Sequence, residues 1–309
     1  LVGSEMCIRD RYSQTQNCNE RMFFLMKIAV SSYSFSQAMR DGRMTIMDVI
    51  PKAKEMGYEG VEIVRGGWSD EEMRAMAPKL KAQSEEYGMP IIAYMVGADF
   101  IRNGLDAEVE RLKREAEVAA LLGAPRMRHD STGGRDANDN PVTVEEALPI
   151  VAEGYRRVTE FAAGLGVHTM IENHGYFFQD ACRVKKLIET VNHPNFGWLM
   201  DMGNFMCADE KPVESVKIAA PMAVHAHAKD FFHKEKGEYV PNGQGWFGTR
   251  GGNALRGTII GHGAVNVPEC LKTLRAAGYD GWLSVEFEGI EDCITSLEAD
   301  LKNLKEMLA

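Results

Sequence analysis

The sequence predicts an α/β fold in which eight parallel strands close into a barrel. Its 309 residues suit one domain of this kind. From residue 26 onward, short apolar or β-branched runs alternate with longer amphipathic stretches, which is typical of parallel strand–helix units. The first run, KIAVSSYSFS, lacks the G-x-G-x-x-G turn of open nucleotide-binding sheets. We therefore expect a single-domain (β/α)8 TIM barrel rather than a doubly wound open sheet.

Eight segments have the length and composition of buried strands. A helical pattern separates each of them from the next, and eight is the number of units that closes a barrel. The expected strands are KIAVS (27–31), GVEIV (60–64), PIIAYM (90–95), PRMRHD (125–130), HTMIEN (168–173), FGWLMD (196–201), VHAHAK (224–229) and WLSVEF (282–287).

The stretches between these strands carry helix start and stop signals. Several are expected to end at a glycine that leads into the next strand, as at Gly57 and Gly123. Three begin with a capping box, in which a hydroxyl residue and an acid three positions later satisfy free backbone N–H groups. These pairs are Thr45 with Asp48, Ser69 with Glu72, and Thr143 with Glu146.

Two connections, 131–142 and 231–265, are longer than the others. Both follow the C-terminal end of an expected strand, which is the side where barrel enzymes build their sites. Long loops in a compact domain are usually lids or binding loops. We expect both to border a functional site.

Composition narrows the class of protein. The formal net charge is −10, which disfavours binding to nucleic acid or to an anionic membrane surface. No apolar run has the length of a membrane span. The six cysteines are scattered without a C-x-x-C pair, a pattern that favours reduced thiols and a cytoplasmic location.

The first 25 residues differ from the rest of the chain. They show no hydrophobic periodicity, and their EMCIRDR stretch resembles translated sequencing-adapter sequence. We predict that 1–25 is a non-native or disordered extension, with a natural start at Met22 or Met26, and that 26–309 is the barrel.

Four successive expected strands end in groups that bind metals or transfer protons. Side chains two apart on a strand face the same way, so the residues of each strand can be grouped by face. They are Glu172 with His174, Asp201, then His225, His227 and Lys229, and finally Glu286 with Glu288. One such residue is commonly a turn former or a solvated side chain, whereas four adjacent strands indicate a shared site.

The best ligand set for a metal is Glu172, Asp201, His227 and Glu286. Three carboxylates and one imidazole suit Mn²⁺, with Mg²⁺ or Co²⁺ as alternatives, better than zinc, which prefers thiolate and imidazole. Two choices stay open at this point, because His225 shares a face with His227 and Glu288 shares a face with Glu286.

Four motifs, IENHG, LMDMGNF, HAHAKDF and SVEFEG, occur in this order at barrel spacing. Together they resemble the sugar phosphate isomerase/epimerase superfamily of xylose isomerase-like TIM barrels, over most of residues 26–309. The resemblance implies that Glu172, Asp201, His227 and Glu286 hold one divalent metal. It also implies that Glu172 and Glu286 move a proton on opposite faces of a carbon next to a carbonyl, through an enediolate.

Further residues are candidates for the substrate side of the site. His174 is a candidate for proton transfer, and Lys229 for holding a substrate oxygen or phosphate. Asn204 stands where the 3-epimerases of this superfamily carry a substrate-binding histidine, so the particular sugar is open. His129, His262 and Arg250 lie at expected loop mouths and are candidates for substrate contact.

The main expectation is a sugar isomerase or epimerase acting on a small molecule, as a homo-oligomer or with a small partner subunit. A close alternative is a carbon–carbon lyase, because IENHGYFFQD, MGNFMCADE and WFGTRGGN resemble catalytic subunits of C-glycoside deglycosidases, which act on 3-oxo-glycosides. An abasic-site endonuclease is disfavoured, since the expected strand ends IVRGGW and AYMVGADF carry no histidine ligand. A non-catalytic sugar-binding barrel is disfavoured by the intact ligand set.

Overall fold

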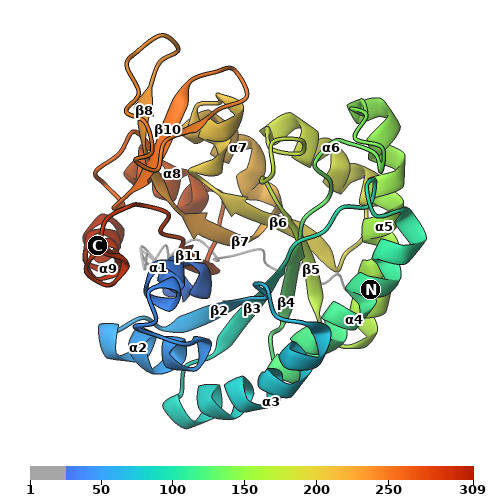
Figure 1. Cartoon of the computed structure of the whole chain (residues 1–309), viewed down its shortest axis with the longest axis horizontal. Helices are drawn as coiled ribbons and strands as arrows, with labels where there is room; N and C mark the ends of the chain where they lie inside the picture. The colour runs from blue at the N-terminus through green and yellow to red at the C-terminus, as the bar shows by residue number, and fades with distance from the viewer. Residues whose placement is uncertain (1–25) are drawn as a thin grey trace, which may run out of the picture.

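Eight parallel strands form a closed barrel in this computed structural model, as the sequence predicts (Figure 1). The structure describes residues 26–309, so the expectation for 1–25 lies outside the described residues. Around the barrel the strands follow the order β1-β11-β7-β6-β5-β4-β3-β2. They are β1 (Lys27–Ser31), β2 (Gly60–Val64), β3 (Ile91–Val96), β4 (Arg126–His129), β5 (His168–Glu172), β6 (Phe196–Asp201), β7 (Ala223–Ala228) and β11 (Trp282–Val285).

The helices cover the outside of the barrel (Figure 1). All three predicted capping boxes are present, and Gly57 and Gly123 end their helices with φ values of 91° and 72°. This left-handed backbone favours glycine. The helices are α1 (Ser36–Arg40), α2 (Val49–Met56), α3 (Asp70–Tyr87), α4 (Leu105–Leu122), α5 (Val144–Gly164), α6 (Ala181–Val191), α7 (Pro212–Ala219), α8 (Val267–Ala276) and α9 (Cys293–Leu308).

The last barrel strand is shorter than predicted. It ends at Val285, because the hydroxyl of Ser34 takes the next backbone groups: it donates to the carbonyl of Val285 at 3.2 Å and accepts from the N–H of Phe287 at 2.9 Å. Glu286 and Glu288 therefore lie just beyond the strand, in the connection to α9. This places both carboxylates at the C-terminal mouth of the barrel.

The barrel has two apolar layers and one polar end. A continuous core fills the space between strands and helices, and it includes Trp198, Tyr155 and Phe100. A smaller cluster of Ala93, Met95, Met170 and Leu199 packs between the strands. Apolar packing on both faces explains why the strands read as nearly continuous hydrophobic runs. Polar side chains instead gather at the C-terminal ends of the strands.

The long connection 231–265 is not the plain loop that the sequence suggested. It contains an antiparallel sheet of β8 (Asp230–Lys234), β10 (Ala254–Thr258) and β9 (Phe247–Gly248), outside the ring of barrel strands (Figure 1). The strands escaped detection because they are short and because β8 pairs with β10 about twenty residues later. Asp209 fixes the turn between β9 and β10 by accepting hydrogen bonds from Thr249 and Asn253.

None of the helices described for residues 26–309 is both long and apolar enough to cross a membrane. The cysteines of this part of the chain, Cys182, Cys207, Cys270 and Cys293, are free thiols.

Candidate metal centre

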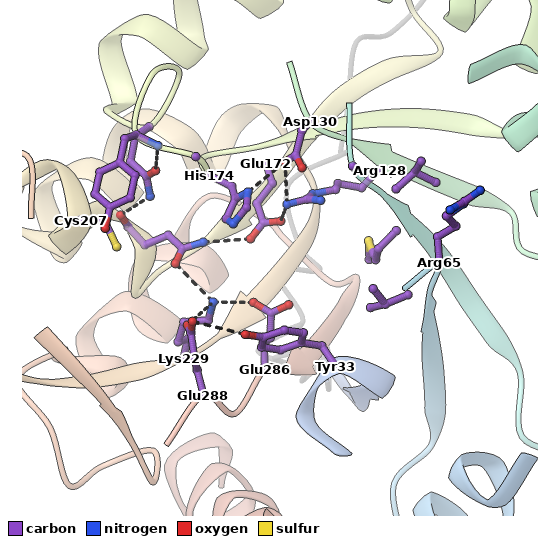
Figure 2. Close-up of a pocket in the computed structure, with 18 of the residues that line it drawn as sticks. Tyr33, Arg65, Arg128, Asp130, Glu172, His174, Cys207, Lys229, Glu286 and Glu288 are labelled. Atoms are coloured by element: carbon purple, nitrogen blue, oxygen red, sulfur yellow. Dashed lines mark hydrogen bonds and ion pairs between the residues drawn. The ribbon is translucent and has the colours of Figure 1, made fainter. Parts of the chain in front are cut away.

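A cavity of about 690 Å³ opens at the C-terminal ends of the barrel strands (Figure 2). Its volume lies in the range of small-molecule sites. Glu172, His174, Asn204, Lys229 and Glu286 all line it. The structure thus brings together the strand-end residues that the sequence selected.

Four candidate ligand atoms converge beside this cavity, which Glu172 and Glu286 line. Nδ1 of His227 lies 3.7 Å from Oε1 of Glu172, 3.7 Å from Oδ2 of Asp201 and 3.7 Å from Oε2 of Glu286. All four side-chain atoms lie within 4.8 Å of one another. Each is supplied by a different element: β5, β6, β7 and the segment after β11.

Two of these atoms test whether the residues fit a cation. Nδ1 of His227 and Oδ2 of Asp201 are buried and have no hydrogen-bond partner among residues 26–309, although the ammonium of Lys229 lies 3.5 Å from Oδ2. A buried polar atom without a partner is costly, by about 1–3 kcal/mol. A cation between the imidazole nitrogen and the three carboxylates would satisfy both atoms. The residues therefore fit one divalent metal ion.

Glu62 settles which histidine faces the cluster. Its carboxylate accepts a hydrogen bond from Nε2 of His227 at 3.1 Å, which leaves Nδ1 free for a ligand role. His225 lies deeper in the barrel, where its Nε2 contacts Glu62 and, at 3.2 Å, Ser284. Although burial would raise the pKa of Glu62, the two histidines hold that pKa well below its usual range. Carboxylate–histidine pairs of this kind orient metal ligands in proteins.

Lys229 separates the roles of the two glutamates. Its buried ammonium lies 2.5 Å from Oε2 of Glu286, 3.4 Å from Oε2 of Glu288 and 3.5 Å from Oδ2 of Asp201. Burial opposes the charge, but these carboxylates raise the pKa of Lys229 well above its usual value. Although burial raises the pKa of Glu286, Lys229 and His227 lower it to about 2. Glu286 belongs to the cluster, whereas Glu288 stays at the cavity rim.

Arg128 connects the cluster to His174. Its Nη2 lies 2.7 Å from Oε2 of Glu172 and 3.0 Å from Oδ1 of Asp130 (Figure 2). The same Asp130 oxygen lies 2.9 Å from Nδ1 of His174. Burial works against a charged imidazole, but Asp130 raises the pKa of His174. Arg128 and Asp130 thus hold Glu172 and His174 on one wall of the cavity.

Asn204 joins the two sides of the site. Its amide nitrogen donates to Oε1 of Glu172 at 3.0 Å, and its amide oxygen accepts from Lys229 at 3.3 Å. The side chain is nearly fully buried and lines the cavity. Asn204 therefore positions a ligand and a lysine in addition to facing the cavity.

Three predicted substrate-binding residues are not among the residues that line the cavity. His129 faces away from the barrel interior and stacks on Tyr155 with ring centroids 4.3 Å apart, because its strand neighbour Arg128 takes the inward position. His262 is exposed in the segment before α8. Arg250 binds Asp180 at 2.8 Å and so ties the β9–β10 turn to the start of α6.

Sequence reasoning missed Glu62, Arg65 and Arg128. Arg65 lines the cavity at the end of β2, while Glu62 and Arg128 lie within strands β2 and β4. A signal was available, because a charged residue inside an apolar strand such as GVEIV must have a buried partner. Without the fold, that partner cannot be identified.

The fold and this cluster define a parallel barrel with a candidate metal centre at its C-terminal mouth. The family model of the xylose isomerase-like TIM barrel matches residues 50–308, and the chain belongs to this family. The resemblance inferred from the four motifs is confirmed at this level.

Individual relatives are distant. An inosose dehydratase of Clostridium botulinum is 28% identical over 159 residues, which cover 51% of this chain and 53% of the relative. The match thus spans about half the length of that relative. The rhizopine catabolism protein MocC of Rhizobium meliloti is 25% identical over 260 residues, covering 80% of this chain and 76% of the relative.

Solved structures share the architecture. A crystal structure of the IolI protein with a bound zinc atom has a TM-score of 0.72 at 16% identity, covering 92% of this chain and 98% of that chain. At this identity the likeness shows the fold alone.

Proposed function

We propose that this chain is a metal-dependent enzyme that removes a proton from the carbon next to the carbonyl of a sugar or cyclitol. The observation that carries the proposal is Nδ1 of His227, which lies 3.7 Å from each of three carboxylates and has no partner among the described residues. Glu172, Asp201, His227 and Glu286 would hold one divalent cation, for which we propose Mn²⁺.

When bound, the cation would polarise the carbonyl and so acidify the neighbouring C–H bond. The protein supplies the proton acceptors. Glu172 ends β5 and Glu286 follows β11, three strands away around the barrel, so they approach the cavity from different sides (Figure 2). A carboxylate on one side removes the proton, and a carboxylate on the other side returns it. The product is an epimer or an isomer.

A second outcome is elimination, and one observation favours it. His174 lines the cavity beside Glu172, and Asp130 orients its ring through a 2.9 Å hydrogen bond. An oriented imidazole can protonate a group as it leaves the next carbon. The leaving group is water in a dehydratase and an aglycone in a C-glycoside lyase. The name of the inosose dehydratase relative supports the dehydratase outcome.

Deuterium uptake from D₂O tests the proposal. The Mn²⁺-loaded protein would be incubated with ketoses, ketose phosphates, an inosose and 3-oxo-glycosides, and substrate deuteration would be followed by NMR. We expect exchange at the carbon next to the carbonyl, lost in a Glu172→Gln variant. Loss of water or aglycone alongside exchange would select elimination. A metal-loaded protein that exchanges none of these substrates would contradict the proposal.

A further inference from the structure

The charged side chains that line the cavity determine whether an anionic substrate can bind there. Four basic side chains line the cavity: Arg65, Arg128, His174 and Lys229. Within the cavity, the charge of a substrate phosphate or carboxylate would have to be balanced by one of them or by the metal. Whether these side chains are available is therefore the question that decides the substrate class.

Each of the four is already paired with a carboxylate. Arg65 lies 2.6 Å from Asp70 and 3.1 Å from Glu115. Arg128 contacts Glu172 at 2.7 Å, and His174 contacts Asp130 at 2.9 Å. An anionic substrate group would have to break one of these ion pairs. Solvent screens most of the pairs only weakly, because at least one partner in each is buried.

Lys229 is the most heavily paired of the four. Only 4% of its side chain is exposed, and its ammonium contacts Glu286, Glu288 and Asp201 within 3.5 Å. An anionic group that approached Lys229 would meet Glu288 as well, whose side chain is 34% exposed at the rim. Like charges at this spacing repel.

A backbone nest in the connection between β7 and α8 is also filled, although its residues do not line the cavity. TIM barrels often bind phosphate with backbone N–H groups in the loops after strands seven and eight. Here Gly261, Gly263 and Val265, in the segment before α8, form such a nest. All three N–H groups donate to the buried carboxylate of Asp230, at 2.9, 2.9 and 3.0 Å. The protein's own carboxylate occupies the place of an anion.

We infer that this cavity selects uncharged, polyhydroxylated ketones and excludes sugar phosphates and carboxylated analogues. The inference deepens the proposed function and rests on it for the nature of the reaction. The hydroxyl groups of such a substrate can share the existing ion pairs without breaking them, since a hydroxyl both donates and accepts. Tyr33, Tyr176 and Phe247 also line the cavity and offer apolar ring faces to the C–H groups of a sugar.

Matched pairs of compounds test the inference in two ways. In the exchange assay, D-fructose would be compared with D-fructose 6-phosphate, and D-tagatose with D-tagatose 6-phosphate. In a calorimetric assay that needs no turnover, D-glucitol would be compared with D-glucitol 6-phosphate, on metal-free and on Mn²⁺-loaded protein. We expect the uncharged member to be favoured by roughly 100-fold in both assays, since unfavourable juxtaposition of like charges is costly.

A Glu288→Gln variant sharpens the test. Removing this rim carboxylate should improve binding of D-glucitol 6-phosphate by roughly 10-fold and change binding of D-glucitol little. Glu291→Gln is the matched control, because Glu291 pairs with Arg256 and does not line the cavity. Equal or tighter binding of the phosphate by the unaltered protein would overturn the inference. Deuterium exchange on a ketose phosphate would also overturn the inference, but it would support the proposed function. Exchange on no ketone would count against the proposed function, and the calorimetry alone would then decide the inference.

Discussion

Nε2 of His227 lies 3.1 Å from Oε2 of Glu62, on the opposite side of the ring from the three carboxylates of the cluster. This contact fixes the hydrogen on Nε2 and presents the lone pair of Nδ1 to the cluster. Glu62 is fully buried and comes from β2, far in sequence from the four residues of the cluster. The orientation of the histidine ligand thus depends on a residue that touches no other member of the cluster.

A Glu62→Gln variant should therefore bind Mn²⁺ more weakly. Loss of a carboxylate that orients a histidine ligand typically lowers metal affinity by about 10- to 100-fold. Isothermal titration of the metal-free protein with Mn²⁺ measures the change. Glu291→Gln, which alters a charge outside the cavity, is the control. An unchanged Mn²⁺ affinity in Glu62→Gln would contradict the role of Glu62 in orienting His227.

Removing Arg128 should destabilise the metal-free protein more than the metal-loaded protein. In Arg128→Met, Glu172 and Asp130 lose the guanidinium that pairs them, and breaking a buried ion pair costs about 3–5 kcal/mol. A bound cation would restore part of the lost charge compensation at Glu172. The free energy of unfolding, measured in urea with and without Mn²⁺, checks this. An equal loss of unfolding free energy with and without Mn²⁺ would show that the metal does not compensate the charge of Glu172 when Arg128 is absent.

The pair of His174 and Asp130 should control elimination but not proton exchange. His174→Asn is expected to lose about 100-fold or more in release of water or aglycone, because general acid catalysis contributes on this scale. Its deuterium exchange should fall much less. Asp130→Asn should lower elimination as well, and the double variant should be no worse than His174→Asn alone. Additive losses would mean that Asp130 does not act through His174.

His129 should make the protein less stable as the pH falls. Burial lowers the pKa of His129 from 6.5 to about 4. The unfolded chain therefore binds one more proton than the folded chain between these pH values, and the contribution to stability, fully present above pH 6.5, is lost as the pH falls toward 4. Its full size is about 3 kcal/mol. A His129→Gln variant should show a shallower loss of unfolding free energy across this window in urea melts, and identical slopes would contradict the account.

Much of the fold and the cluster was predictable from the sequence. Buried parallel strands carry strong apolar runs, and the observed strands start and end within about two residues of the predicted ranges. Side-chain alternation placed Glu172, His227 and Lys229 toward one site. The closed barrel brings the C-terminal ends of β5, β6, β7 and β11 to the same mouth. A local sequence pattern alone does not predict this proximity.

Sequence reasoning reached its limit at these residues for separate physical reasons. Loop residues have no periodic rule that assigns their direction, so the sequence could not show that Arg250 binds Asp180 or that His262 faces outward. His129 was misassigned although it lies on a strand, because its inward neighbour Arg128 was not recognised as the functional residue. Glu62 was missed because its partners, His225 and His227, are more than 160 residues away.

The position of a bound Mn²⁺ ion tests the central claim most directly. Crystals of the protein soaked in Mn²⁺ would be measured for anomalous scattering near the manganese edge. We expect one peak between Nδ1 of His227 and the carboxylates of Glu172, Asp201 and Glu286, and no peak in an Asp201→Asn variant. A peak between Glu62, His225 and Nε2 of His227, or no peak at all in the unaltered protein, would contradict the central claim.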